Sequence, residues 1–429
     1  MRASPTLRAT TIATMLCLAF GGAFVSLPAS AQDAEMMKRI ELLQKEIDAL
    51  KAQVQKVQIE QKATEQKVAA QPAVTPPVQQ AEVQTWRKYF SDMPKGEAPA
   101  TSARTGITVY GRFDLGYESN DDGAVTRKVL NSYSSRVGLK GTRVLSDDLT
   151  GIAQIETGVA PDDNANAGTW GSRETYAGLR SKTFGTVKVG KHDSPFKDLE
   201  GEAAPMWGQG EAMEVIIHGK GTKVAAGSTF ENFHTRYTNV VQYETPKFAN
   251  FQVKAAYSTD EVNGATGTVK KPSWATSADW DTGKWYAGVA YQVMENFNGQ
   301  GKDLTGLKAA GSVVLGDFTA GAMWSRLDND VGKKTNNWLL SGTYKMGQIA
   351  FKSTYAESSE TASGAADGIK FLGFEVDYLI DKHTAVYGYY TKIKNDTNAR
   401  GRFAAGENTY SPAAGNDPSV FAIALRYNF

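Results

Sequence analysis

The chain has 429 residues, a formal net charge of +1 and a mean hydropathy of −0.38. The near-neutral charge gives no indication of a nucleic-acid partner. After residue 31 no apolar run approaches 18 residues, which excludes membrane-spanning helices. A chain of this kind either folds in water or crosses lipid as strands of alternating polarity.

Residues 1–31 have the three parts of a secretory signal peptide, although a single membrane anchor is the alternative. Arg2 and Arg8 give a positive start, an apolar stretch runs from about residue 12 to residue 27, and residues 29–31 read Ala-Ser-Ala. Cleavage would remove both arginines and change the formal charge from +1 to −1. It would also remove Cys17, the only cysteine, so the exported chain holds itself together without disulfides.

Residues 32–70 contain a heptad pattern that predicts a periplasmic α-helical coiled coil. A strict repeat of 3.5 residues produces a left-handed supercoil, and the other helix faces are almost wholly Lys, Glu and Gln. A single amphipathic helix packed on a soluble core is the alternative. Isoleucine and leucine in the seam favour dimers, whereas Gln61 and Thr64 weaken that preference and leave the oligomeric state open. The seam positions are Ile40, Leu43, Ile47, Leu50, Val54, Val57, Gln61, Thr64 and Val68.

Residues 71–106 are rich in proline, alanine, glutamine and threonine, which indicates a semi-extended linker. Trp86, Tyr89 and Phe90 interrupt this composition. These aromatic residues either rest against the rim of the following domain or enter its mouth.

From Ile107 to Phe429 the hydrophobic period changes to two, which is typical of β-strands. Apolar residues alternate with small or polar ones at 107–115, 251–257, 285–291, 307–315, 372–378 and 421–429. About 320 residues follow this pattern, far too many strands for side chains to fill the centre of a soluble barrel. We therefore predict an all-β membrane protein, an antiparallel transmembrane β-barrel with its apolar face toward lipid and its polar face toward water.

The number of strands follows from the direction in which each strand must run. Tight turns at 184–185, 247–250, 316–317, 346–347 and 381–382 belong at one end of the barrel, and longer loops at the other. A first count of 15 strands gives two neighbours the same direction. A further strand at 273–281, turned at 281–283, restores the alternation and predicts 16 strands with both termini in the periplasm.

Several motifs along this region resemble the general porins of Gram-negative bacteria, of the beta-proteobacterial type. The resemblance covers about 107–429 and implies a homotrimer of 16-stranded barrels, with the third external loop folded inward to narrow each pore. The N-terminal coiled coil departs from the plainest members. The motifs, in family order, are Tyr110–Asp114, Ser135–Gly141, Gln154–Gly158, Tyr176–Leu179, Phe184–Lys191, Val241–Pro246 and Arg426–Phe429.

The loop between the fifth and sixth barrel strands, residues 193–235, is the candidate constriction. It is the longest loop and carries a net charge of −4, and three of the four histidines lie in or beside it. Its acidic residues include Glu200, Glu202, Glu211 and Glu214. We expect it to fold into the lumen.

A basic wall is expected opposite this loop. If Val137 and Leu139 face lipid, then Arg136 and Lys140 face the lumen, and the same parity directs Arg112, Arg180, Lys188 and Arg426 inward. Fixed positive charge in a narrow aqueous passage favours anions. Gln242 and the acidic loop leave weak or cation selectivity as the alternative.

Resemblance to anion-selective relatives points to three arginines at the constriction. They match Arg136, Arg173 and Arg236. Arg173 shares its parity with Leu179 and would face lipid unless the end of its strand twists.

No catalytic motif is present. We therefore expect that the protein is not an enzyme and that it has no cofactor and no metal site. The sequence predicts an outer-membrane channel for passive diffusion of small hydrophilic solutes, with anion preference, in contact with lipid and lipopolysaccharide. A substrate-specific channel for small anions is one alternative. A barrel that only anchors a periplasmic tether, joined to the cell wall through the coiled coil, is another.

Overall fold

The computed structural model describes residue 45 and residues 105–161, 169–219, 233–259, 271–296, 301–328, 330, 332–405 and 410–429. The predicted signal peptide, coiled coil and linker lie outside the described residues, apart from Lys45 and residues 105–106. Among the described residues, no helix is long and apolar enough to span a membrane.

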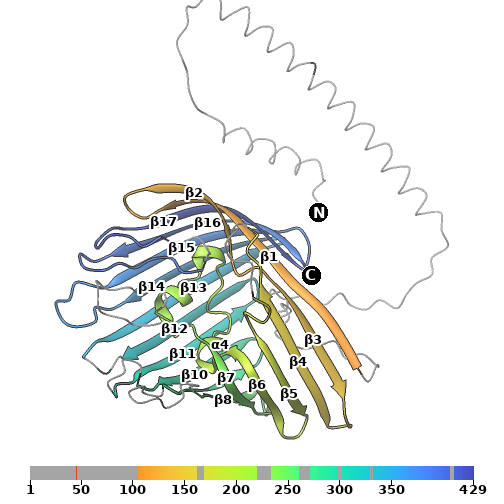
Figure 1. Ribbon diagram of the computed structural model, residues 1–429. Helices are drawn as coiled ribbons and strands as arrows, with labels where there is room; N and C mark the ends of the chain where they lie inside the picture. The colour runs from red at the N-terminus through yellow and green to blue at the C-terminus, as the bar shows by residue number, and fades with distance from the viewer. Residues whose placement is uncertain are drawn as a thin grey trace, which may run out of the picture. The chain divides into compact units, whose positions relative to one another are not determined.

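The described residues form one antiparallel sheet that curves into a barrel (Figure 1). Its strands are β1 (Thr105–Asp121), β2 (Thr126–Ser132), β3 (Arg136–Val144), β4 (Leu149–Gly158), β5 (Thr175–Ser181), β6 (Gly185–Asp193), β7 (Arg236–Glu244), β8 (Phe251–Ser258), β9 (Ser273–Asp281), β10 (Trp285–Met294), β11 (Leu304–Leu315), β12 (Phe318–Asp328), β13 (Lys334–Met346), β14 (Ile349–Ser358), β15 (Ile369–Leu379), β16 (Thr384–Asn395) and β17 (Ser419–Asn428). Three short helices, α4 (Pro195–Asp198), η1 (Gly208–Gly210) and η2 (Met213–Ile217), lie in the long loop after β6.

The long strand β1 closes the barrel. It pairs with β17 along one edge, with Phe113 opposite Tyr427, and with β2 and β3 along its other edge. β2 and β3 are therefore two segments of one barrel strand, interrupted at residues 133–135, where Ser134 has a φ of 57°. The described strands make 16 barrel strands, and the predicted number is confirmed. β9 coincides with the strand that the direction of the chain required at 273–281.

Side chains alternate between the two faces of the sheet. In β17, Phe421, Ile423 and Leu425 are 48–60% exposed, whereas Ala422 and Ala424 are buried. An apolar outer band with a polar interior is the pattern of a barrel whose outside contacts lipid.

The two ends of the barrel differ in their connections. At the end that carries the first residue of β1 and the last of β17, strands are joined by short turns such as 316–317 and 347–348. Gly316 and Gly347 adopt positive φ there, a conformation that glycine reaches without steric cost. The longest connections, 194–235 and 396–418, lie at the other end, as predicted.

Candidate functional site

The 193–235 loop enters the barrel directly after β6. Ser194 caps α4 by accepting a hydrogen bond from the Lys197 amide, and Pro195 occupies the first turn, where its missing N–H costs nothing. The Ser194 hydroxyl also donates to Gln292 Oε1 on β10, at 2.7 Å. Residues adjacent to the strand end therefore fix the direction in which the loop leaves the wall.

Beyond α4 the loop follows the inner wall from strand to strand. The Glu202 amide donates to Ser312 on β11, Ser341 on β13 donates to the Ala203 carbonyl, and the Gln209 amide donates to the Tyr389 hydroxyl on β16. These lumen-facing partners hold the loop across the side of the barrel formed by β10–β16. The loop therefore lies inside the barrel, as the sequence predicted.

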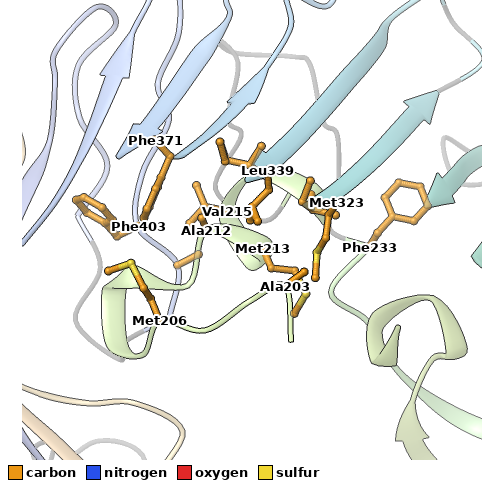
Figure 2. Packing of buried hydrophobic residues seen from close by; sticks show 14 of the residues in the cluster. Ala203, Met206, Ala212, Met213, Val215, Phe233, Met323, Leu339, Phe371 and Phe403 are labelled. Atoms are coloured by element: carbon orange, nitrogen blue, oxygen red, sulfur yellow. The ribbon is translucent and has the colours of Figure 1, made fainter. Parts of the chain in front are cut away.

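Apolar side chains cover the underside of the loop. Figure 2 shows Ala212, Met213 and Val215 gathered with Met323 of β12 and Leu339 of β13. All of these residues are at most 8% exposed. The loop is therefore packed against the wall by burial of apolar surface as well as by hydrogen bonds.

Trp207 fixes the middle of the loop to the part of the wall formed by β14, β15 and β17. Its indole ring lies between Arg426 of β17 and Lys352 of β14, whose Cζ and Nζ atoms are each 3.7 Å from the ring centroid. Its amide donates to Glu375 Oε2 of β15 at 2.7 Å. Each cation–π contact contributes about 0.5–2 kcal/mol, depending on how well it is desolvated.

The two cations at Trp207 are themselves paired with carboxylates. Arg426 Nε donates to Asp114 Oδ2 at 2.7 Å, and Lys352 Nζ lies 2.6 Å from both Glu375 Oε1 and Asp377 Oδ2. Arg426 was predicted to face the lumen; it does lie on the inner face, but it is buried and holds the loop. Lys352 and Trp207 were not predicted as site residues. The inward parity of Lys352 beside the outward Phe351 is the signal that would have identified it.

A group of three arginines lies at β1, β3 and β4, and two of them share one carboxylate. Arg112 and Arg136 lie opposite each other across β1 and β3. Glu156 of β4 lies 3.7 Å from Arg136 Nε and 2.6 Å from Arg173 Nε, and Arg112 Nε donates to the neutral Asn428 side chain. Arg173 therefore reaches the lumen side. The parity that would have directed it toward lipid does not apply, because β5 begins at Thr175, after Arg173.

Three further predicted basic residues, Lys140, Lys188 and Arg236, each have an acidic or aromatic neighbour. Arg236 and Lys197 both pair with Asp193, at 3.0 and 2.9 Å. Lys188 pairs with Glu244 at 2.6 Å, and Lys140 Nζ lies 4.4 Å from the ring centroid of Tyr110.

The four predicted acidic residues of the loop divide into three positions. Glu200 and Glu202 lie just after α4, half-buried, and Glu211 is close enough to Arg112 and Arg426 to act on them electrostatically. Glu214 is buried, and its Oε1 lies 3.0 Å from His234 Nε2. The loop therefore presents Glu211 toward the arginine wall and turns Glu214 away from it.

A closed barrel with an apolar exterior, a polar interior and a loop folded into the lumen is the architecture of a β-barrel membrane channel. Comparison with known proteins gives the family. The family model described as Gram-negative porin matches residues 96–398. The chain therefore belongs to the Gram-negative porin family.

Curated relatives agree with this assignment. An outer membrane porin of Bordetella pertussis is 23% identical over 78% of this chain and 87% of its own length. Outer membrane porin protein 32 of Delftia acidovorans is 24% identical over 77% of this chain and 96% of its own length. Major outer membrane protein P.IB of Neisseria lactamica is 30% identical over 39% of this chain, a match that spans 48% of that relative.

Solved structures share the fold at low sequence identity. The anion-selective porin from Comamonas acidovorans has a TM-score of 0.64 and 20% identity, over 76% of this chain and all of that one. OmpF of Salmonella typhi has a TM-score of 0.59 and 15% identity, over 76% of this chain and 98% of that one. The trimer form of OmpT of Vibrio cholerae has a TM-score of 0.58 and 16% identity, over 76% of this chain and all of that one.

Proposed function

We propose that the chain forms a water-filled channel in the outer membrane through which small hydrophilic solutes diffuse, with a preference for anions. The observation that carries the anion preference is how Arg112, Arg136 and Arg173 are paired. Among the described residues, Arg136 and Arg173 share one carboxylate, Glu156, and Arg112 donates a hydrogen bond to the neutral side chain of Asn428.

An excess of fixed positive charge on one side of a narrow aqueous passage raises the local concentration of anions. The similar porin from Comamonas acidovorans is described as anion-selective, which supports the same sign here. The constriction on this proposal lies between this wall and Glu211, with Lys140, Lys188 and Arg236 contributing further positive charge. Glu200 and Glu202 temper the preference from the loop side.

Reconstitution in planar bilayers tests both parts. An ohmic channel is expected. In a salt gradient, the sign of the reversal potential should indicate that anions permeate more readily than cations. Arg136→Glu should move that potential toward cations, because it reverses a charge at the constriction. Arg143→Glu is the matched control, since Arg143 is exposed and shares the outward parity of Leu139 on the same strand.

The alternatives give different results in the same experiment. A folded barrel with no ohmic conductance would favour a tethering protein whose barrel is only an anchor. Saturable block of the current by one class of small anion would favour a substrate-specific channel. An unchanged potential in Arg136→Glu would remove Arg136 from the constriction.

We also propose that the chain assembles as a homotrimer and that residues 32–70 form a periplasmic coiled coil, which clamps the trimer or spans toward the cell wall. A similar porin from Vibrio cholerae was solved in a trimer form, and the heptad seam of the sequence supports the coiled coil. A truncation that begins at Thr105 tests the clamp. Trimers of the truncated chain that dissociate at the same temperature as those of the full chain would disprove it.

A further inference from the structure

Three lysines lie together on the outer face of the barrel, at the end that carries the long connections. Lys370 of β15 and Lys394 of β16 are direct cross-strand partners, and Lys392 precedes Lys394 on the same face of β16. All three side chains are exposed. Side chains of cross-strand partners start about 4.5–5.5 Å apart, and like charges placed there repel each other. The sheet therefore holds two ammonium groups in an unfavourable pairing.

The carboxylates around these lysines compensate the repulsion only weakly. Lys370 Nζ lies 3.9 Å from Glu357 Oε1, and Lys392 Nζ lies 3.9 Å from Asp417 Oδ2. Both distances exceed the range of about 2.7–2.9 Å in which an ammonium group donates a strong hydrogen bond to a carboxylate. Among the described residues, no carboxylate lies within 4.0 Å of Lys394 Nζ. The three ammonium groups are therefore available to an anion from outside the chain.

The outer face becomes apolar immediately below the lysines. Leu372 lies opposite Lys392, Phe374 lies opposite Tyr390, and Tyr390 lies opposite Phe421. These four apolar or aromatic side chains are 40–56% exposed. Outward aromatic residues mark the level at which the lipid headgroups meet the acyl chains. The lysines therefore lie at headgroup level, above a surface that suits acyl chains.

Other lysines at the same end of the barrel are arranged differently. Lys334 Nζ lies 2.7 Å from Asp328 Oδ2, and Lys128 Nζ donates to Ser119 Oγ at 2.6 Å. Lys302, just before β11, lies 3.5 Å from Asp330. Each of these lysines lies on a different part of the wall and has a closer partner than Lys370 or Lys392. The grouping on β15 and β16 is therefore distinct from the ordinary charge of the rim.

We propose that Lys370, Lys392 and Lys394 bind the phosphate groups of a lipid A molecule, the phosphorylated glycolipid of lipopolysaccharide, whose acyl chains lie along Leu372 and Phe374. A phosphate between Lys370 and Lys394 relieves their repulsion and accepts charge-assisted hydrogen bonds from both. Clusters of basic side chains at a membrane surface attract anionic lipids in this way. The apolar rows below the lysines favour a lipid over free phosphate. The inference rests on the proposed outer-membrane location and does not depend on conductance.

The main test is titration of the purified protein in detergent with bisphosphorylated lipid A, with bound lipid counted by native mass spectrometry. The triple variant Lys370→Gln/Lys392→Gln/Lys394→Gln should bind about 10- to 100-fold more weakly than the wild type, because it removes three ammonium groups from the headgroup level. The wild type should bind lipid A without phosphate groups as weakly as the triple variant binds the bisphosphorylated form. Equal affinities of the wild type and the triple variant for bisphosphorylated lipid A would overturn the proposal.

The three lysines elsewhere on the rim give a control with the same change in charge. Lys128→Gln/Lys302→Gln/Lys334→Gln should bind bisphosphorylated lipid A as the wild type does. An equal loss of affinity in this control would assign the binding to the general charge of the rim and overturn the site. Inorganic phosphate alone is the second probe. If it bound the wild type as tightly as lipid A does, the assignment to a lipid would be wrong.

Thermal unfolding of Lys394→Gln distinguishes a ligand site from a structural role. In lipid-free detergent the variant should unfold at a higher temperature than the wild type, because the like charge opposite Lys370 is gone. With saturating bisphosphorylated lipid A the order should reverse, because the wild type binds the lipid more tightly. The same order in both conditions would overturn the site.

Conductance separates this inference from the channel proposal. The three lysines face outward, so the triple variant Lys370→Gln/Lys392→Gln/Lys394→Gln should conduct as the wild type does. Loss of conductance in that variant would contradict a site confined to the outer face. A barrel that shows no conductance but discriminates lipid A through these lysines would support the site and contradict the channel proposal.

Discussion

Arg426 lies over the ring of Trp207, with its guanidinium carbon 3.7 Å from the centre of the indole ring. The two residues are far apart in the sequence, one in the last strand and one in the loop after β6. Their contact joins the strand that closes the barrel to the segment that narrows it. Because Arg426 is also paired with Asp114 of β1, one group of side chains holds both the loop and the junction between β1 and β17.

Removal of the Trp207 ring should release the middle of the loop. We expect Trp207→Ala to lower the free energy of unfolding by about 3–5 kcal/mol, the usual effect of removing a buried tryptophan ring. It should also raise single-channel conductance. Trp207→Phe keeps an aromatic ring between the two cations, so its free energy of unfolding should fall by less than that of Trp207→Ala. Denaturant unfolding and bilayer recording check both effects, and unchanged values in Trp207→Ala would exclude Trp207 as an anchor.

Lys352 should be a strong determinant of stability because it is buried between two carboxylates. Lys352→Met leaves Glu375 and Asp377 without their cation, and we expect a loss of about 3–5 kcal/mol in the free energy of unfolding. Lys334→Met is the matched control. Lys334 pairs with Asp328 at 2.7 Å but is half-exposed, so its loss should cost about 1 kcal/mol or less. Equal losses in the two variants would contradict this account.

Ion selectivity should depend on pH through Glu174, which lies just before β5. Burial, together with the negative charges of Asp193 and Asp198, raises the pKa of the Glu174 carboxyl group. As the pH falls from 7 toward 5, Glu174 therefore gains a proton before ordinary carboxylates do, and anion preference should increase. Glu174→Gln should show a higher anion preference at pH 7 and a smaller change on acidification.

The reversal potential in a salt gradient measures this change. Asp122→Asn is the control. The hydrogen bond from Arg127 lowers the pKa of the Asp122 carboxyl group, and this residue stays charged over the whole range. A pH dependence that persists in Glu174→Gln would assign the effect to another group.

The pairing of β1 with β17, which closes the barrel, should be sensitive to any side chain at position 111. Gly111 and Phe429 exchange two backbone hydrogen bonds, of 2.9 and 3.1 Å, and a Cβ at Gly111 would lie 2.3 Å from Phe429 Cζ and 2.8 Å from the Arg136 carbonyl oxygen. We expect Gly111→Ala to lower the temperature at which the barrel unfolds in detergent. Adding Phe429→Ala should recover only part of the loss, because the contact with the Arg136 carbonyl remains. Gly141→Ala on β3 meets nothing within 4 Å and should behave as the wild type does.

The sequence alone determined the barrel and the number of its strands. Successive side chains of a strand point to opposite faces of the sheet. In a membrane barrel the outer face contacts lipid and the inner face lines the lumen, so Phe421 and Ala422 indicate their faces without any distant contact. The direction of each strand then required a strand at 273–281. The inward parity of Arg112 and Arg136 followed from the same local rule.

Only the tertiary structure decided what each inward side chain does. Parity placed Arg426 in the lumen but could not distinguish a group facing solutes from one buried against Trp207. It also failed for Arg173, which lies outside the strand whose period was used. The contact of Trp207 with Lys352, and the 2.9 Å hydrogen bond between Lys308 Nζ and His218 Nε2, depend on how a long loop packs inside a closed barrel. Such contacts join residues that no local period connects, so they appear only when the whole sheet has closed.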